Sequence, residues 1–271
     1  MYLKRKIDEY LLEWKKNEER LPLIIKGARQ IGKTESINHF AEQNYSNIVS
    51  INFVLEPKYK TILSDGYAVE DIIKNISMID TSKRFIAGDT VIIFDELQEF
   101  PDIATALKSF RIDGRFDVIC SGSLLGINYR KIHSNSVGYK TDYEMFSMDF
   151  EEFLMAAGET DLCDLLRQPD WEILKILSLK YVDLLRQYCY VGGMPEVVDC
   201  FFQHQNLQEV RDKQTEILDA YRRDISKHTT PTESIRIGQV LQSLPSQLAK
   251  ENKKFIYNVL KKGARATEYE L

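Results

Sequence analysis

The feature that most constrains this chain is an octet, Gly27 to Thr34, which reads GARQIGKT and has the pattern G-x-x-x-x-G-K-[ST]. It follows a short apolar run, residues 21–26, and leads into residues 34–40, which have helical spacing. Glycines at the two ends allow successive backbone N–H groups to face one anion, and the following helix adds its positive N-terminal end. The order of strand, tight loop and helix therefore predicts a phosphate-binding loop.

The whole loop and the residue after it are predicted to bind a nucleotide. The expected contacts are Gly27, Ala28, Arg29, Gln30, Ile31, Gly32, Lys33, Thr34 and Glu35. The Lys33 ammonium is expected to reach the β- and γ-phosphates and so to act in catalysis, and the Thr34 hydroxyl is expected to ligate Mg²⁺. The predicted cofactors are therefore ATP and Mg²⁺.

A second apolar run, residues 90–94, ends in the acidic pair Asp95 and Glu96. Its continuous apolar character suits a parallel strand that is buried on both faces. Beside a phosphate-binding loop, Asp95 is expected to hold the metal together with Thr34. Glu96 is a candidate catalytic residue, because an acid next to the metal ligand can orient or polarise an attacking water. Many small-molecule kinases with this loop need no such acid, so Glu96 favours hydrolysis.

A third run, residues 116–123, is predicted to be the next strand and ends in Ser121-Gly122-Ser123. A polar residue at the tip of the strand between the two motif strands is expected near the γ-phosphate. Ser121 and Ser123 are therefore candidate catalytic residues. Ser-Gly-Ser is equally typical of a turn, so both interpretations stay open, as does the choice between the serines.

Strands and helices alternate through the first half of the chain. Residues 47–53 and 143–148 have strand character, with helical stretches at 68–79 and 103–110 between them. This alternation predicts an α/β fold, in which helices flank a parallel sheet with right-handed crossovers.

The segment before the phosphate loop, residues 2–20, has an apolar face at helical spacing. The residues on this face are Leu3, Ile7, Tyr10, Leu11 and Trp14. Core packing is the expected role of this face, and a contact with the adenine base is the alternative.

The second half of the chain loses strand character after residue 154. Helical periodicity covers residues 171–190 and 207–225, with a Gly- and Pro-containing break at 191–195 between them. The predicted domains are a P-loop core at 1–150, a helical lid at 151–229 and a further region at 230–271.

Several segments resemble a single family: RLPLIIKGARQIGKT, VIIFDELQEFPDIATALKSF, DVICSGSLLG, YEMFSMDFEEFL and YVGGMPEVV. They are similar to prokaryotic AAA-superfamily ATPases that carry a C-terminal domain of unknown function, and the resemblance spans nearly the whole chain. It implies an AAA-type ATPase core, a helical lid and a winged-helix-like region that begins within 230–271. Relatives continue well past residue 271, so we expect this chain to be truncated.

One departure from the family concerns its arginine. Relatives often carry Gly-Arg just before the fifth strand, where this chain has Gly138-Tyr139-Lys140. An arginine there would reach the γ-phosphate of a neighbouring subunit. Arg130 and Lys140 are the candidate substitutes, and the oligomeric state stays open.

Composition limits the remaining function classes. The chain has 271 residues with 44% apolar and 28% charged content, which is ordinary for a soluble globular protein. No uninterrupted apolar stretch approaches the roughly 20 residues of a membrane span, and no secretory signal is evident. The four cysteines, Cys120, Cys163, Cys189 and Cys200, lack metal-site or disulfide spacing. We therefore expect a cytoplasmic protein without a membrane partner.

A basic run near the C-terminus raises nucleic acid as a partner. Residues 250–265 hold six basic residues and one acidic residue, whereas the whole chain has a net charge of −5. The run has the character of a nucleic-acid footprint, although a solvated face flanking a strand at Phe255, Tyr257 and Val259 is the more common explanation.

The expected function is an ATP-hydrolysing switch or machine that acts on an unknown protein partner and turns over slowly without it. Lys33, Thr34, Asp95 and Glu96 carry the predicted chemistry. One alternative is a P-loop kinase of a small molecule, which Glu96 and the lack of an Arg-rich substrate lid disfavour. Another is a low-turnover, nucleotide-gated adaptor for DNA or protein.

Overall fold

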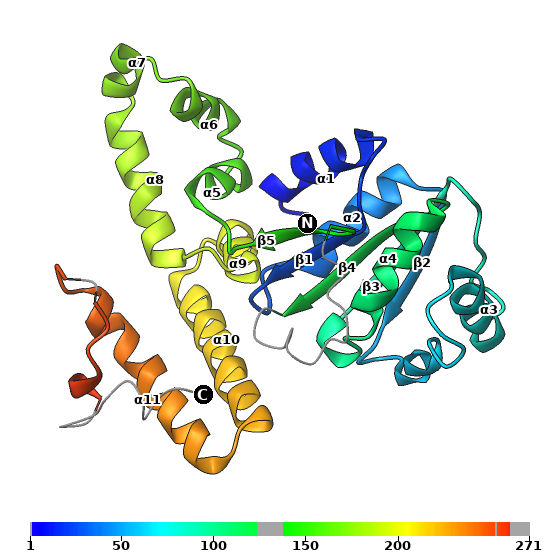
Figure 1. The fold of residues 1–271 in the computed structure, drawn as a ribbon. Helices are drawn as coiled ribbons and strands as arrows, with labels where there is room; N and C mark the ends of the chain where they lie inside the picture. Colours follow the sequence, from blue (N-terminus) through cyan, green and yellow to red (C-terminus); the bar gives the residue numbers. More distant parts are fainter. Residues whose placement is uncertain (1, 124–137, 253, 261–271) are drawn as a thin grey trace. The chain divides into compact units, whose positions relative to one another are not determined.

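A five-stranded parallel sheet forms the centre of the first half of the chain (Figure 1). The computed structural model describes residues 2–123, 138–252 and 254–260. The strand order is β2-β3-β4-β1-β5, the order typical of the AAA P-loop fold. The strands are β1 (Leu23–Gly27), β2 (Asn47–Asn52), β3 (Thr90–Asp95), β4 (Asp117–Ser123) and β5 (Thr141–Met145). The predicted α/β fold class is confirmed.

Helices cover both faces of the sheet. They are α1 (Lys6–Lys16), α2 (Lys33–Asn44), α3 (Val69–Ile79) and α4 (Ile103–Asp113), with short 3₁₀ helices η1 (Pro57–Thr61) and η2 (Leu97–Glu99). Side chains of α1 and α2 pack on one face and those of α3 and α4 on the other. Alternate residues of β3 enter the two cores, Ile92 on one side and Ile93 on the other. Every residue of β3 is therefore buried, which explains its continuous apolar sequence.

The register of the sheet gathers the predicted site at one edge. Gly27 at the end of β1 pairs with Ser123 of β4 and with Met145 of β5. On the other side of β4, Asp95 at the end of β3 pairs with Asn52 at the end of β2. Because all strands are parallel, these residues share the carboxyl edge, where open α/β sheets bind their ligands.

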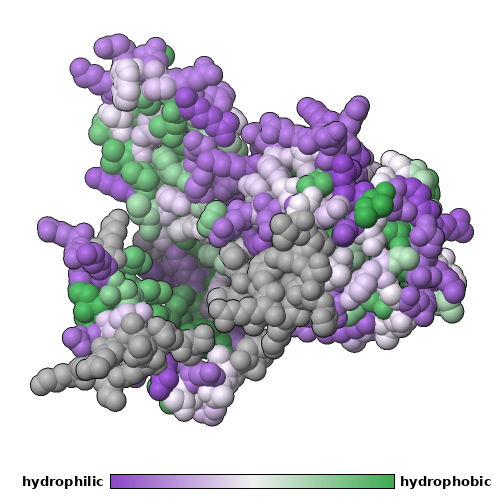
Figure 2. Space-filling view, viewed as in Figure 1, coloured by the Kyte–Doolittle hydropathy of each residue, from purple (hydrophilic) through white to green (hydrophobic). Residues whose placement is uncertain are grey.

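A run of helices follows the sheet in the same compact unit, Met1–Gln205. These helices are α5 (Phe150–Ala156), α6 (Thr160–Arg167), α7 (Trp171–Ile176), α8 (Ser178–Val191) and α9 (Pro195–His204). The helix predicted over 171–190 is thus two helices, interrupted at Leu177. Figure 2 shows hydrophilic residues over α1 and apolar residues on α8, where Leu179, Val182 and Leu185 are exposed.

The predicted break between α8 and α9 has a packing reason. Gly193 approaches the start of the helical run so closely that a Cβ on it would lie 2.1 Å from the Met148 carbonyl oxygen. The Met148 N–H donates a hydrogen bond of 2.7 Å to the Gly193 carbonyl. Glycine is therefore needed where the loop before α9 meets the chain before α5.

The second compact unit, Asn206–Leu271, contains α10 (Leu207–His228), α11 (Pro231–Leu248) and the 3₁₀ helix η4 (Tyr257–Val259). Pro245 lies inside α11 and does not end it. The expected strand over Phe255, Tyr257 and Val259 is wrong. The Gln247 side-chain oxygen accepts from the Ile256 N–H at 2.7 Å, and its side-chain nitrogen donates to the Ile256 carbonyl oxygen at 3.4 Å. A single side chain thus takes the backbone groups that a partner strand would pair with.

The predicted boundaries at residues 150 and 229, and the winged-helix-like region at 230–271, remain predictions. The division into compact units falls at Gln205, inside the predicted lid. No helix in the described parts of the chain is both long and apolar enough to cross a membrane.

Candidate functional site

The phosphate loop runs from the end of β1 to the start of α2 and needs both of its glycines. A Cβ on Gly27 would lie 2.3 Å from the Met145 carbonyl oxygen and 2.5 Å from Ile31 Cδ1. Gly32 has a φ of +88° and precedes α2 in the left-handed region. The first N–H groups of an α-helix have no partner within the helix, and those of α2 directly follow the loop. This backbone has the shape expected of the predicted anion-binding loop.

The Lys33 ammonium lies against the inner side of this loop. Its Nζ donates to the carbonyl oxygens of Ala28 at 2.6 Å and Gly27 at 3.2 Å. Burial lowers the pKa of Lys33, although the negative charges of Glu96 and Asp95 act in the opposite direction. Among the other predicted contacts, Ile31 is buried in the core, whereas Ala28, Arg29 and Gln30 are exposed.

The predicted metal ligands lie next to each other. The Thr34 hydroxyl is 3.2 and 3.3 Å from the two carboxylate oxygens of Asp95. Asp95 is only 5% exposed, and it also accepts from the Asn52 side-chain amide at 2.9 Å and from the Ser121 hydroxyl. A hydroxyl beside a carboxylate that is held by neighbouring donors suits Mg²⁺, which prefers oxygen ligands.

Glu96 follows Asp95 in a strained conformation. Its φ is +61°, in the left-handed region that non-glycine residues seldom adopt. Its carboxylate accepts a hydrogen bond from the side-chain amide of Gln98. The side-chain amide oxygen of Gln98, Oε1, in turn accepts from the Ser123 backbone N–H at 3.1 Å. Gln98 therefore links the candidate catalytic acid to the tip of β4.

The two candidate serines of β4 have different surroundings. Ser121 is 1% exposed and contacts Asp95 on the metal side of the site. Ser123 lies two residues further along and contacts Gln98 through its backbone, on the Glu96 side.

Asn52 and Gln98 were missed by the sequence analysis. The signals available were a polar residue that ends β2 and a glutamine two positions after the candidate acid. Neither signal identifies a site residue until the contacts of Asn52 with Asp95 and of Gln98 with Glu96 are known.

A pocket of about 330 Å³ lies beside the phosphate loop. The N-terminal segment, the start of α2 and the start of α9 line it, with Tyr2, Gly32, Glu35, Pro195 and Asp199 among the lining residues. Tyr2 stacks on His39 with ring centroids 3.7 Å apart. Pro195 Cγ lies 3.7 Å from the position that a Cβ on Gly32 would take, so the loop before α9 places that helix against the phosphate loop.

Of the two candidate arginine-finger substitutes, Lys140 is the one that lies within the described residues. The Lys140 ammonium pairs with Asp142 of β5 at 2.6 Å. Arg130 lies outside the described residues, as do Lys253, Lys261, Lys262 and Arg265 of the basic run.

Comparison with solved structures finds similar chains of low identity. PCH-2 of C. elegans has 13% identity and a TM-score of 0.35 over 62% of this chain and 49% of its own. The Holliday junction branch migration motor RuvB of Thermotoga maritima has 17% and 0.35 over 58% and 50%. Drosophila ORC bound to DNA has 13% and 0.40 over 92% and 68%. This chain spans about half the length of the first two.

Comparison with family models is more specific. A search of curated proteins finds no match. A model described as "Domain of unknown function (DUF8612)" matches residues 182–271, and one described as "AAA domain" matches residues 19–154. The matched core contains the phosphate loop, Asp95, Glu96 and both serines. As the sequence resemblance indicated, this chain belongs to the AAA domain family.

Proposed function

We propose that this chain binds ATP with Mg²⁺ and hydrolyses it slowly, as a nucleotide-driven switch that acts on a protein partner. Membership of an ATPase family supports the coarser part of this proposal. The observation that supports binding of Mg·ATP is the meeting of Thr34, Asp95 and Ser121 at the carboxyl edge of the sheet, with Lys33 on the adjacent loop.

In this proposal the loop binds the phosphates and Thr34 and Asp95 hold the metal. The N–H groups at the start of α2 and the Lys33 ammonium supply donors and positive charge toward the β- and γ-phosphates. Mg²⁺, when bound, neutralises charge on the phosphate oxygens. Asn52 and Ser121 donate to Asp95 and so keep its carboxylate in one orientation.

Glu96 is proposed to orient the attacking water, which favours hydrolysis over transfer to a small molecule. It directly follows the proposed metal ligand Asp95 in the chain. Its carboxylate is held by Gln98, which is itself held by Ser123. An acid fixed in this way suits acid–base work on water. A kinase receives its nucleophile on the substrate and does not need it.

The adenine base is proposed to enter the pocket beside Gly32. This pocket adjoins the loop and has walls of mixed character, with the Tyr2 ring, Pro195 and the carboxylate of Asp199. The aromatic ring and the proline ring offer apolar contact, and a carboxylate can accept from an amino group. The contact comes from the segment before α1 rather than from the apolar face of α1, because Ile7, Leu11 and Trp14 are buried in the core.

The test separates binding from chemistry. Calorimetry with Mg·ATP should find binding by the wild type that Lys33→Ala abolishes or severely weakens, since a charge-assisted contact is lost. Glu96→Gln should keep ATP but hydrolyse it about 10²–10⁴-fold more slowly, the scale of a positioned acid–base group. Asp95→Asn should weaken the metal-dependent part of binding.

Glu99→Gln is the matched control for Glu96→Gln. Glu99 pairs with Lys60 at 3.2 Å near the surface, three residues beyond Glu96. Its variant should hydrolyse ATP like the wild type. A wild type that does not bind Mg·ATP refutes the proposal, and wild-type turnover by Glu96→Gln refutes the role of Glu96.

A further inference from the structure

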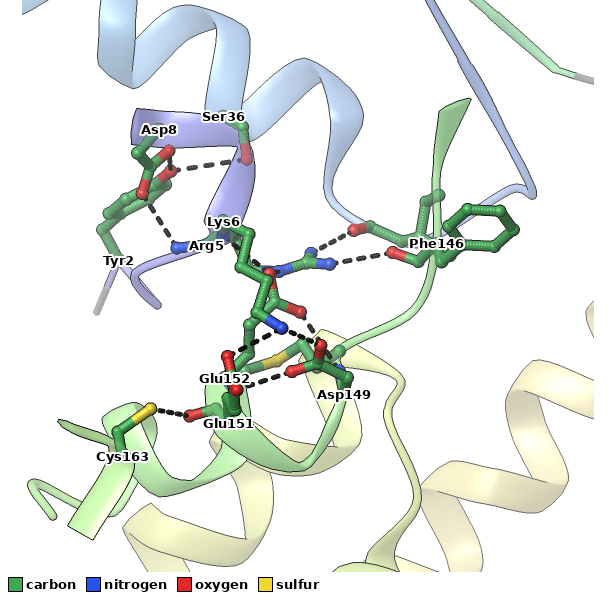
Figure 3. A network of polar contacts seen from close by, with 12 residues as sticks. Tyr2, Arg5, Lys6, Asp8, Ser36, Phe146, Asp149, Glu151, Glu152 and Cys163 are labelled. Carbon is green, nitrogen blue, oxygen red and sulfur yellow. Dashed lines mark hydrogen bonds and ion pairs between the residues drawn. The ribbon is translucent and has the colours of Figure 1, made fainter. Parts of the chain in front are cut away.

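A buried arginine from the N-terminal segment contacts the phosphate loop and also lines the pocket beside Gly32; Figure 3 shows its polar contacts. Arg5 is 4% exposed, and its guanidinium reaches three separate parts of the chain. One terminal nitrogen donates to the Ile31 carbonyl oxygen at 2.7 Å, and the other donates to the Phe146 carbonyl at 2.8 Å. The remaining nitrogen, Nε, lies 3.1 Å from the Glu152 carboxylate. Arg5 thus joins the loop, the end of β5 and helix α5.

Glu152 is also held tightly. It is 5% exposed, and its two oxygens accept from the backbone N–H groups of Lys6 at 2.7 Å and Asp149 at 3.1 Å. Asp149 is the N-cap of α5 and forms a capping box with Glu152. The carboxylate that pairs with Arg5 is therefore part of the structure that starts the first helix after the sheet.

Stability alone is a poor reason for this arrangement. Burying an ion pair removes both charges from water, and its attraction often does no more than offset that loss. The Arg5 Nε has an ion-pair distance to Glu152 but lacks hydrogen-bond geometry. The hydrogen bonds of Arg5 go instead to carbonyl oxygens, one of them in the phosphate loop. This distribution points to a task at the loop.

The task follows from the geometry of one peptide unit. The Ile31 carbonyl and the Gly32 N–H belong to the same planar trans peptide, so they point in opposite directions. A donor that fixes the carbonyl from behind also fixes the direction of the N–H in front. Gly32 has the widest backbone freedom at this point, with a φ of +88°. The bond from the Arg5 cation also polarises the peptide and strengthens the N–H as a donor.

We propose that Arg5 is a positioning residue for the nucleotide. It holds the Ile31–Gly32 peptide with its N–H toward the phosphates, and through Glu152 it ties the orientation of this peptide to helix α5. A movement of α5 relative to the sheet then changes the phosphate loop directly. This inference rests on the proposed ATP-binding function.

Arg20 provides a matched control. It also ties the segment before β1 to the sheet, with a bidentate pair to Asp117 at 2.6 and 3.0 Å. Asp117 is the first residue of β4, at the opposite end of the strand from Ser123. Arg20→Gln therefore removes an ion pair that is more exposed than that of Arg5, and it does so without touching the phosphate loop.

The experiment measures ADP affinity by calorimetry and the thermal midpoint without nucleotide for each variant. Arg5→Gln should raise the Kd for ADP by about tenfold or more, the scale of a hydrogen bond that involves a charged group. Arg20→Gln should lower the thermal midpoint but leave the Kd unchanged. Glu152→Gln should raise the Kd in the same direction, and the double variant with Arg5→Gln should be no weaker than Arg5→Gln alone.

If Arg5 has a purely structural role, Arg5→Gln should lower the thermal midpoint and leave the Kd of the folded fraction at the wild-type value. That result overturns the inference and leaves the ATP-binding proposal standing. If Arg5→Gln does not fold, Glu152→Gln decides, and a wild-type Kd there overturns the inference. A wild type that binds no ADP or ATP instead refutes the proposed function itself.

Discussion

Replacing Gln98 by alanine should lower kcat for ATP hydrolysis while leaving ATP affinity close to that of the wild type. The Gln98 amide donates to the Glu96 carboxylate and accepts from the Ser123 N–H at 3.1 Å. Without it, the carboxylate keeps its charge but loses the contact that orients it. Within the described residues, the side-chain hydrogen bonds of Gln98 go to Glu96 and Ser123 and not to Lys33, Thr34 or Asp95. Binding of the phosphates and the metal should therefore persist.

The size of the effect can be bounded from both sides. A hydrogen bond to a charged group contributes about 1.5–3 kcal/mol, and each 1.36 kcal/mol changes a rate about tenfold. Loss of the Gln98–Glu96 contact should therefore reduce kcat about ten- to hundredfold. The upper bound is Glu96→Gln, expected at about 10²–10⁴-fold, because Gln98 acts only through Glu96.

Steady-state kinetics of the two single variants and the double variant provide the assay. If Gln98 acts by orienting Glu96, the double variant should be no slower than Glu96→Gln alone. Glu99→Gln is the control for a nonspecific change in this turn. Wild-type kcat in Gln98→Ala, or losses that multiply fully in the double variant, would refute the reasoning.

Three further predictions concern the loop and the surface. Gly27→Ala should destabilise the fold by about 1–3 kcal/mol in urea unfolding and weaken ATP binding, because the new methyl meets the Met145 carbonyl; Gly238→Ala, where a Cβ has open space, is the control, and equal stability of the two variants would contradict this. Burial lowers the pKa of Lys33 below its ordinary 10.5, and the protonated ammonium is the form that binds phosphate. ATP affinity should therefore fall as the pH rises through this lowered pKa, and an affinity unchanged up to pH ~10 argues against the prediction. Because the net charge is −5, residues 1–271 should bind duplex DNA weakly or not at all, and tight binding that falls steeply with salt would show otherwise.

The local features of the site could be read from the sequence because each depends on a few consecutive residues. The two glycines of the loop are required by the backbone over eight positions. A strand buried on both faces needs an unbroken apolar run, and that run places Asp95 at its carboxyl end. The same kind of local rule predicted the α/β alternation and the break before Pro195.

The tertiary structure decided which distant residues meet. Asn52 contacts Asp95 only because β2 and β3 pair in a register that aligns their ends. The phosphate loop meets Arg5 because the N-terminal segment passes behind it, and Glu152 completes that contact from helix α5, across 147 positions of sequence. Likewise, the Gln247 side chain accepts the Ile256 N–H that a neighbouring strand would otherwise pair with. Contacts of this kind depend on strand register and on side chains packed across elements, which no short window of sequence contains.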